Sequence, residues 1–156
     1  MADTYTKIYI HVIFTVQGRQ NLMDRQHKDE LYKYITGIIQ NKKQKVISIN
    51  GMSDHIHILI GIKPDTALSD LIRDVKANSS KFINERRWVA GRFHWQEGFG
   101  AFSYSHSQLG SVANYIKNQE EHHSKKTFKD EYLGMLRKFG VDYNPKYIFD
   151  WIDGQE

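Results

Sequence analysis

The sequence predicts an α+β fold: one antiparallel sheet with helices on one face, in the ferredoxin-like or RRM-like split βαβ arrangement, plus C-terminal helices. Two observations carry this prediction. Segments in which apolar residues alternate with polar ones are interleaved with segments whose apolar residues recur every three or four positions. The resulting order is β-α-β-β-α-β-α with a small helical end, without an internal repeat or a domain boundary. We therefore expect a single domain over residues 1–156.

The first half of the chain supplies three strands and one helix. Alternating apolar residues over 8–16 predict the first strand, and 17–21 predict a turn. Helical spacing over 24–41 predicts the first helix. Alternation returns over 45–52 and a second β-rich run covers 55–62, so these two segments are expected to form a hairpin.

A second helix and a fourth strand follow the hairpin. Residues 64–66 read Pro-Asp-Thr, and Asp65 or Thr66 is expected to cap a helix whose apolar face runs from Leu68 to Phe82. Residues 98–104 read as a short strand. In this arrangement the helices cover one face of the sheet, and we expect the other face to be open.

The C-terminal third is expected to be helical. Ser107 is a suitable N-cap for a helix that carries Val112 and runs to Gln119. Thr127 resembles the cap of a last short helix that ends near residue 139. The tail from Val141 shows no regular pattern.

Composition narrows the class of protein. The chain has 40% hydrophobic and 26% charged residues, as expected for a folded globular domain. Its formal charge is +4 and its pI about 9.2, a basic excess compatible with nucleic acid. It has no cysteine, which excludes disulfides, thiolate metal sites and cysteine nucleophiles. The polar N-terminus and the lack of a long apolar run predict a cytoplasmic protein that does not enter a membrane.

A pair of histidines, His55 and His57, is separated by one residue at the start of the third predicted strand. Residues i and i+2 of a strand point to the same face, so the two imidazoles should lie side by side, with Ile56 on the opposite face. Neutral imidazoles are common ligands of divalent ions, and two of them need at least one further donor. The alternative is a pair of solvent-facing histidines on a hairpin.

Tyr115 and Gln119 are four residues apart, so on a helix they share a face. A tyrosine can attack phosphorus if a metal stabilises the developing charge, and a glutamine carbonyl oxygen can bind a hard cation. The alternative is that Tyr115 is an aromatic residue packed beside Val112 and Ile116.

A glycine-rich stretch suggests a different class of protein. Gly98, Phe99, Gly100 and Tyr104 fit part of the RRM motif whose aromatic residues stack on bases, although Glu97 stands at its basic position. A non-catalytic RRM-like nucleic-acid-binding module, which would stack bases on Phe99, Phe102 and Tyr104, is therefore an alternative.

Basic residues gather on the second predicted helix and in the loop beyond it. They could neutralise a phosphate backbone, although interspersed acidic residues are typical of a solvated helix face. The candidates for DNA binding are Arg73, Lys76, Lys81, Arg86, Arg87 and Arg92.

Taken in order, these motifs resemble the single-tyrosine HUH transposases of small bacterial insertion sequences and their REP-associated relatives, the IS200-like superfamily. The likeness covers nearly the whole chain. It rests on the strand that opens at His11 with Arg19 behind it, the His55–His57 strand, the stretch 95–103, and the helix of Tyr115 and Gln119.

The resemblance implies a DNA transposase. Tyr115 would attack single-stranded DNA, leaving a covalent 5′-phosphotyrosine and a free 3′-hydroxyl that allow strand transfer and move an insertion sequence. His55, His57 and Gln119 would hold Mg²⁺ or Mn²⁺. The implied partners are DNA hairpins at subterminal palindromes and a second copy, in a homodimer with composite active sites. A domesticated single-strand endonuclease acting on host repeats is the closest alternative.

Overall fold

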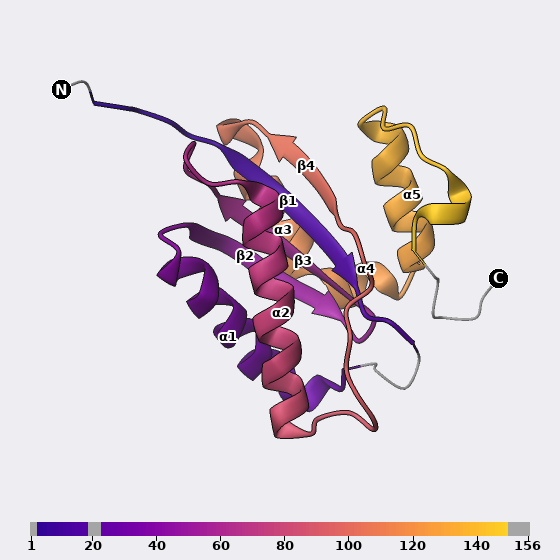
Figure 1. Cartoon of the computed structure of the whole chain (residues 1–156). Coiled ribbons are helices and arrows are strands. Elements are labelled where there is room, and N and C mark those ends of the chain that lie inside the picture. Colours follow the sequence, from indigo (N-terminus) through magenta and orange to yellow (C-terminus); the bar gives the residue numbers. More distant parts are fainter. Residues whose placement is uncertain (1–2, 19–22, 150–156) are drawn as a thin grey trace.

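Four antiparallel strands form one sheet in the order β2-β3-β1-β4 in the computed structural model, which describes residues 3–18 and 23–149 (Figure 1). The strands are β1 (Tyr9–Thr15), β2 (Lys45–Met52), β3 (His55–Gly61) and β4 (Gly100–Tyr104). With α1 (Lys28–Asn41) between β1 and β2, and α2 (Leu68–Arg86) between β3 and β4, this is the predicted split βαβ topology. The α+β fold class is confirmed.

One face of the sheet carries the main core. Alternation along β1 and β3 directs Phe14, Ile56 and Ile58 toward α1 and α2, where they pack with Leu31 and Ile72. All five side chains are fully or almost fully buried. Figure 1 shows α1 and α2 together on this side of the sheet.

The opposite face is not open, contrary to the expectation from the sequence. It is covered by α3 (Leu109–Lys117), α4 (Gln119–His123) and α5 (Phe128–Lys138), which lie behind and beside the sheet in Figure 1. Leu59 packs against α3, and Ile13 of β1 packs against α5. Burying this second set of apolar side chains favours closure of the face, so the histidines of β3 lie in the interior.

Helix α5 meets β4 at a glycine. A Cβ atom added at Gly100 would lie 2.8 Å from Cε1 of Tyr132 and closer still to its hydroxyl. Real Cβ atoms do not approach other atoms so closely. Helix α5 can therefore pack this close to β4 only because residue 100 has no side chain.

The helix starts differ in part from those predicted. α2 begins after Ala67 without a side-chain cap, because the hydroxyl of Thr66 instead accepts a hydrogen bond from Gln44. Ser105, rather than Ser107, forms the capping box, and a 3-10 turn (His106–Gln108) precedes α3. The cap at Thr127 is confirmed, since its side chain accepts from the backbone N–H of Asp130.

Two further short turns, Arg25–His27 and Pro145–Tyr147, complete the described elements. Arg19, the end of the turn predicted over 17–21 and the tail beyond residue 149 lie outside the described residues. Among the helices of residues 3–18 and 23–149, none is both long and apolar enough to span a bilayer.

Candidate active site

His55 and His57 lie side by side on β3 with fully buried side chains. Each ring is oriented through Nδ1: that of His55 lies 2.7 Å from a carboxylate oxygen of Asp54, and that of His57 lies 2.7 Å from Nε2 of His11. Both Nε2 atoms are therefore directed toward the covering helices. Fixing the second ring nitrogen in this way is how proteins usually orient metal-binding histidines.

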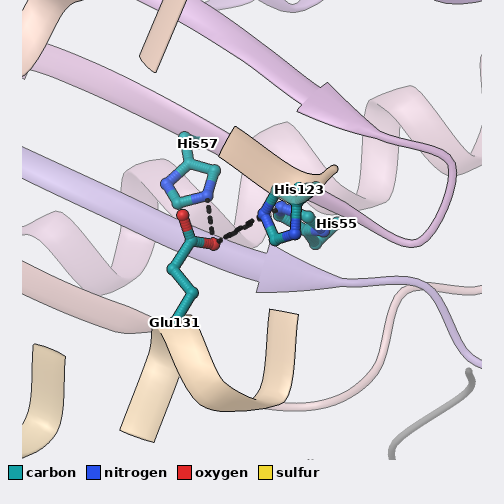
Figure 2. A group of neighbouring side chains, drawn as sticks. All are labelled: His55, His57, His123 and Glu131. Atoms are coloured by element: carbon teal, nitrogen blue, oxygen red, sulfur yellow. Dashed lines mark hydrogen bonds and ion pairs between the residues drawn. The ribbon is translucent and has the colours of Figure 1, made fainter. Parts of the chain in front are cut away.

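Glu131 of α5 stands opposite the histidine pair, and Figure 2 shows its carboxylate between the imidazoles. Its Oε1 lies 3.2 Å from Nε2 of His57 and 3.0 Å from Nε2 of His123, the two contacts dashed in Figure 2. Its Oε2 accepts hydrogen bonds from the Tyr115 hydroxyl and, at 3.3 Å, from the Gln119 amide. One buried carboxylate thus contacts every side chain of the cluster from α3 and α4.

Tyr115 and Gln119 both reach this cluster, although they do not share one continuous helix. α3 ends at Lys117 and α4 begins at Gln119, with Asn118 between them in a non-helical conformation. The carbonyl oxygen of Gln119 lies 3.1 Å from Nε2 of His55. The Tyr115 ring meets the His57 ring edge to face, with centroids 5.9 Å apart.

The donor atoms fit a divalent cation. His55, His57, His123 and Glu131 each offer one ligand atom, and these atoms lie within 4.8 Å of one another. The side-chain amide oxygen of Gln119, Oε1, adds a fifth donor beside His55. Imidazole, carboxylate and amide oxygen are ligands that Mn²⁺ and related dications accept, and the cluster contains no soft sulfur donor.

Burial sets the charge of the cluster. Desolvation, assisted by repulsion from His55 and the other histidines, holds the pKa of His57 well below its usual value. Desolvation likewise lowers the pKa of His123 to about 4. Burial raises the pKa of Glu131 to about 7, against the opposing effect of His55. The imidazoles of His57 and His123 are therefore neutral at physiological pH, which is the form that binds metal.

Asp54 provides the charge behind His55. Burial alone would raise the pKa of Asp54, but the hydrogen bond and charge of His55 outweigh it, so the carboxyl stays ionised well into acid. An ionised carboxylate on Nδ1 makes the opposite nitrogen of His55 a better electron-pair donor.

The six basic residues considered for DNA binding lie apart from this cluster, on and after α2. Lys76 binds the backbone carbonyls of Gln96 and Gly98, at 2.8 and 2.5 Å. Arg73 pairs with Asp70 and Asp74, and Arg86 pairs with Glu30. Arg87 ends α2 in a left-handed conformation.

Lys81 and Arg92 share a hollow of about 530 Å³ between α2 and the loop that follows it. This is the part of the predicted DNA-binding set that lies around a concave surface.

Two of the three aromatic residues of the RRM-like stretch, Phe99 and Phe102, do not share an open stacking surface. Phe102 is 3% exposed and packs beneath α5 against Tyr132 and Phe139. Phe99 packs partly into the core on the other face of the sheet. The RRM-like alternative is wrong on this point, because the face that an RRM leaves open is covered here by helices.

Sequence reasoning gave His11 and Glu131 no role at the site, and it considered His123 as a contact for DNA or a metal but favoured a structural role for it. Glu131 carried a usable signal, since it occupies the apolar stripe of α5 together with Phe128, Tyr132 and Leu136. An acidic residue at a buried helix position needs a partner. His11 and His123 carried no comparable signal in spacing.

Residues 4–119 match the family model described as "Transposase IS200 like". The ISDra2 transposase TnpA of Deinococcus radiodurans is 23% identical over 118 residues, which span 71% of this chain and 83% of that protein.

Two solved structures resemble the fold. A candidate transposase from Deinococcus radiodurans has a TM-score of 0.59 at 19% identity, covering 76% of this chain and 95% of its own. A REP-associated tyrosine transposase bound to a REP hairpin has a TM-score of 0.60 at 14% identity, covering 99% of this chain and 94% of its own.

Proposed function

This chain belongs to the IS200-like transposase family, and from that premise we propose that it cleaves and rejoins single-stranded DNA through Tyr115. The observation that carries the proposal is the meeting of Tyr115 with buried histidines and a carboxylate at one point. In this reaction an insertion sequence is excised and joined elsewhere, within the cytoplasm.

The proposed step exchanges one phosphoester bond for another. The Tyr115 oxygen bonds to the scissile phosphorus and the bond to the 3′-oxygen breaks, which leaves a 5′-phosphotyrosine and, after protonation, a free 3′-hydroxyl. The Tyr115 proton is directed at Oε2 of Glu131, so this carboxylate is in position to receive it. Attack by another 3′-hydroxyl reverses the exchange, and no nucleotide cofactor is needed.

His55, His57 and Gln119 are the residues proposed to hold Mg²⁺ or Mn²⁺, with His123 and Glu131 as further donors. A bound dication would polarise the scissile phosphate and stabilise its developing charge. The chain itself supplies the orientation of these donors, through Asp54 on His55 and His11 on His57.

The proposed partner is single-stranded DNA with hairpin ends. The basic excess and the hollow of Lys81 and Arg92 support contact with a phosphate backbone. Arg73, Lys76, Arg86 and Arg87 remain proposed contacts, with the intramolecular partners described above competing for most of them.

A homodimer with composite sites is the arrangement implied by resemblance. The described chain assembles Tyr115 and His57 within one molecule, so each copy holds all the proposed groups by itself. A homodimer could exchange the Tyr115 helix, and mixing of inactive variants distinguishes the two arrangements.

A domesticated endonuclease acting on host repeats is the second candidate. It is favoured by the REP-associated transposase, whose structure aligns with 99% of this chain. Both candidates use the same chemistry. Imperfect palindromes flanking the gene on both sides would favour a mobile element.

The deciding experiment is a covalent-adduct assay. Labelled single-stranded DNA from the regions flanking the gene is incubated with protein and Mn²⁺, and denaturing electrophoresis detects DNA bound to protein. We expect an adduct with wild type and with Tyr34→Phe, a matched control on the other side of the sheet that stacks on Phe82. We expect none with Tyr115→Phe, and an adduct that persists in this variant would disprove the nucleophile.

A further inference from the structure

A hollow of about 490 Å³ opens beside the nucleophile, between α3 and α5. Its walls include Val112 from α3 and Met135 from α5, with Tyr104 of β4. Tyr115 and Glu131 line it as well, so the hollow is continuous with the candidate active site. Pockets of about 300 to 1,000 Å³ accommodate small organic ligands, so a single nucleotide fits in this one.

The lining changes in character from the walls to the solvent side. Tyr104, Val112 and Met135 offer an aromatic and apolar surface of the kind on which nucleobases stack. Lys126 and Lys138 also line the hollow and are exposed to solvent, where they can meet phosphate groups. An apolar wall joined to two cations suits a ligand with a flat base and an anionic backbone.

We propose that this hollow binds the nucleotide joined to the scissile phosphate. The inference rests on the proposed function, because it places the phosphorus at the Tyr115 oxygen. The nucleotide bonded to that phosphorus must lie beside Tyr115, and the hollow is a concave surface that Tyr115 itself lines. The base occupies the wall of Tyr104 and Met135, and the flanking phosphates face the two lysines.

Gly134 makes the proposal testable without touching the chemistry. It lines the hollow from α5, and a Cβ atom added there meets no other atom within 4 Å. A leucine at this position would therefore extend into the hollow and occupy part of it. Gly110 of α3 offers a matched control, since it is also a helical glycine with open space but is exposed and outside the hollow.

The probes are the four deoxynucleoside 3′,5′-bisphosphates, titrated into ¹⁵N-labelled protein in EDTA and followed by the amide signals of Ser111 and Gly134. We expect saturable shifts at these amides in wild type and in Gly110→Leu. In Gly134→Leu the titration is followed at the amides of the other residues that line the hollow. We expect this variant to bind the bisphosphates about tenfold more weakly or worse. Shifts confined to another surface, or unchanged affinity in Gly134→Leu, would overturn the proposal.

Thermal unfolding tests whether Gly134→Leu loses affinity because it misfolds, and a second variant tests the two lysines. Leucine favours helix over glycine, so Gly134→Leu should unfold at a temperature no lower than wild type. Replacing Lys126 and Lys138 together by alanine removes two exposed charges, and we expect weaker binding with a shallower salt dependence. An unchanged salt dependence would refute the proposed contact between the two lysines and the phosphate groups.

The binding titration and the adduct assay fail separately. Bisphosphates that bind at Gly134 without any covalent adduct would leave the hollow as a nucleotide site and refute the transposase chemistry. The adduct yields of Gly134→Leu and wild type are also compared at DNA concentrations below saturation. Equal yields would support the proposed cleavage chemistry and refute the hollow as a nucleotide site.

Discussion

The hydroxyl of Tyr115 donates a hydrogen bond to the carboxylate of Glu131, which comes from the next long helix and also contacts His57 and His123. The proposed nucleophile is thus held by the same side chain that faces the proposed metal ligands.

Removing the carboxylate should weaken metal binding. Glu131→Ala deletes an oxygen donor that lies 3.0 to 3.2 Å from two imidazoles, so we expect Mn²⁺ affinity to fall by about 10- to 100-fold. Glu131→Gln keeps a neutral oxygen and should lose less. Mn²⁺ titration followed by electron paramagnetic resonance measures both, with exposed Glu121→Ala as the control. Equal affinities in all four proteins would exclude Glu131 as a ligand.

Metal should stabilise the folded chain through the histidine pair. Mn²⁺ at 100 times its dissociation constant should add about 2.7 kcal/mol to the free energy of unfolding, and EDTA should remove it. His57→Ala should abolish the difference between the two conditions, whereas exposed His94→Ala should retain it. Thermal unfolding with and without metal provides the comparison, and a full metal response in His57→Ala would contradict the assignment.

The stability of the metal-free chain should depend on pH through Glu131. Burial raises its pKa to about 7, so folding favours the protonated form. The stabilisation from this group is present in acid and lost as pH rises through about 7. Glutamine cannot ionise, so Glu131→Gln should gain stability relative to wild type as the pH rises from about 4.5, the ordinary pKa of a glutamate, to about 7, and the gain should be constant above that. Urea unfolding in EDTA measures the gap, and a gap that does not widen with pH would refute the buried carboxylate.

Two inactive variants should not complement each other. Each chain brings its own Tyr115 to its own His57, so a co-refolded mixture of Tyr115→Phe and His57→Ala should form no covalent adduct. Composite sites in a homodimer would instead pair the intact tyrosine of one copy with the intact histidines of the other, and an adduct would appear. Light scattering on the same mixture reports whether dimers were present.

The glycine under α5 should be intolerant of a side chain. Gly100→Ala brings a methyl group against the Tyr132 ring, and overpacking of this kind costs about 1–3 kcal/mol. The two positions should be coupled, so Tyr132→Ala should cost less stability in the Gly100→Ala background than in wild type. Urea unfolding of the four proteins completes the cycle. Additive costs would show that the contact does not hold α5 in place.

The fold was predictable because its information is local. Alternation over 45–52 and 55–62 placed β2 and β3 within one residue of their observed ends, and the same two-residue period put His55 and His57 on one face. The covering of that face was not predictable in the same way. It depends on how α3 to α5 pack back across the sheet, which is a long-range contact without a sequence period.

The site shows the same division between local and long-range information. Tyr115 and Gln119 were predicted to face one way by helical spacing, and both side chains reach the histidines although the helix breaks at Asn118. Glu131 is one of 18 acidic residues, and its place in the apolar stripe of α5 predicts burial, which is observed at 4% exposure, but does not predict its partners. Its partners lie 8 to 74 residues away along the chain, and no spacing rule links positions so distant.

The family match ends at residue 119, whereas His123 and Glu131 lie beyond it. The proposed nucleophile and the histidine pair therefore lie within the matched residues, and two of the groups that close around them lie outside. A chimera that takes another protein's helices after residue 119 would keep Tyr115, His55 and His57. It would lose the carboxylate proposed to receive the tyrosine proton, unless the new helices bring an acidic side chain to the same place.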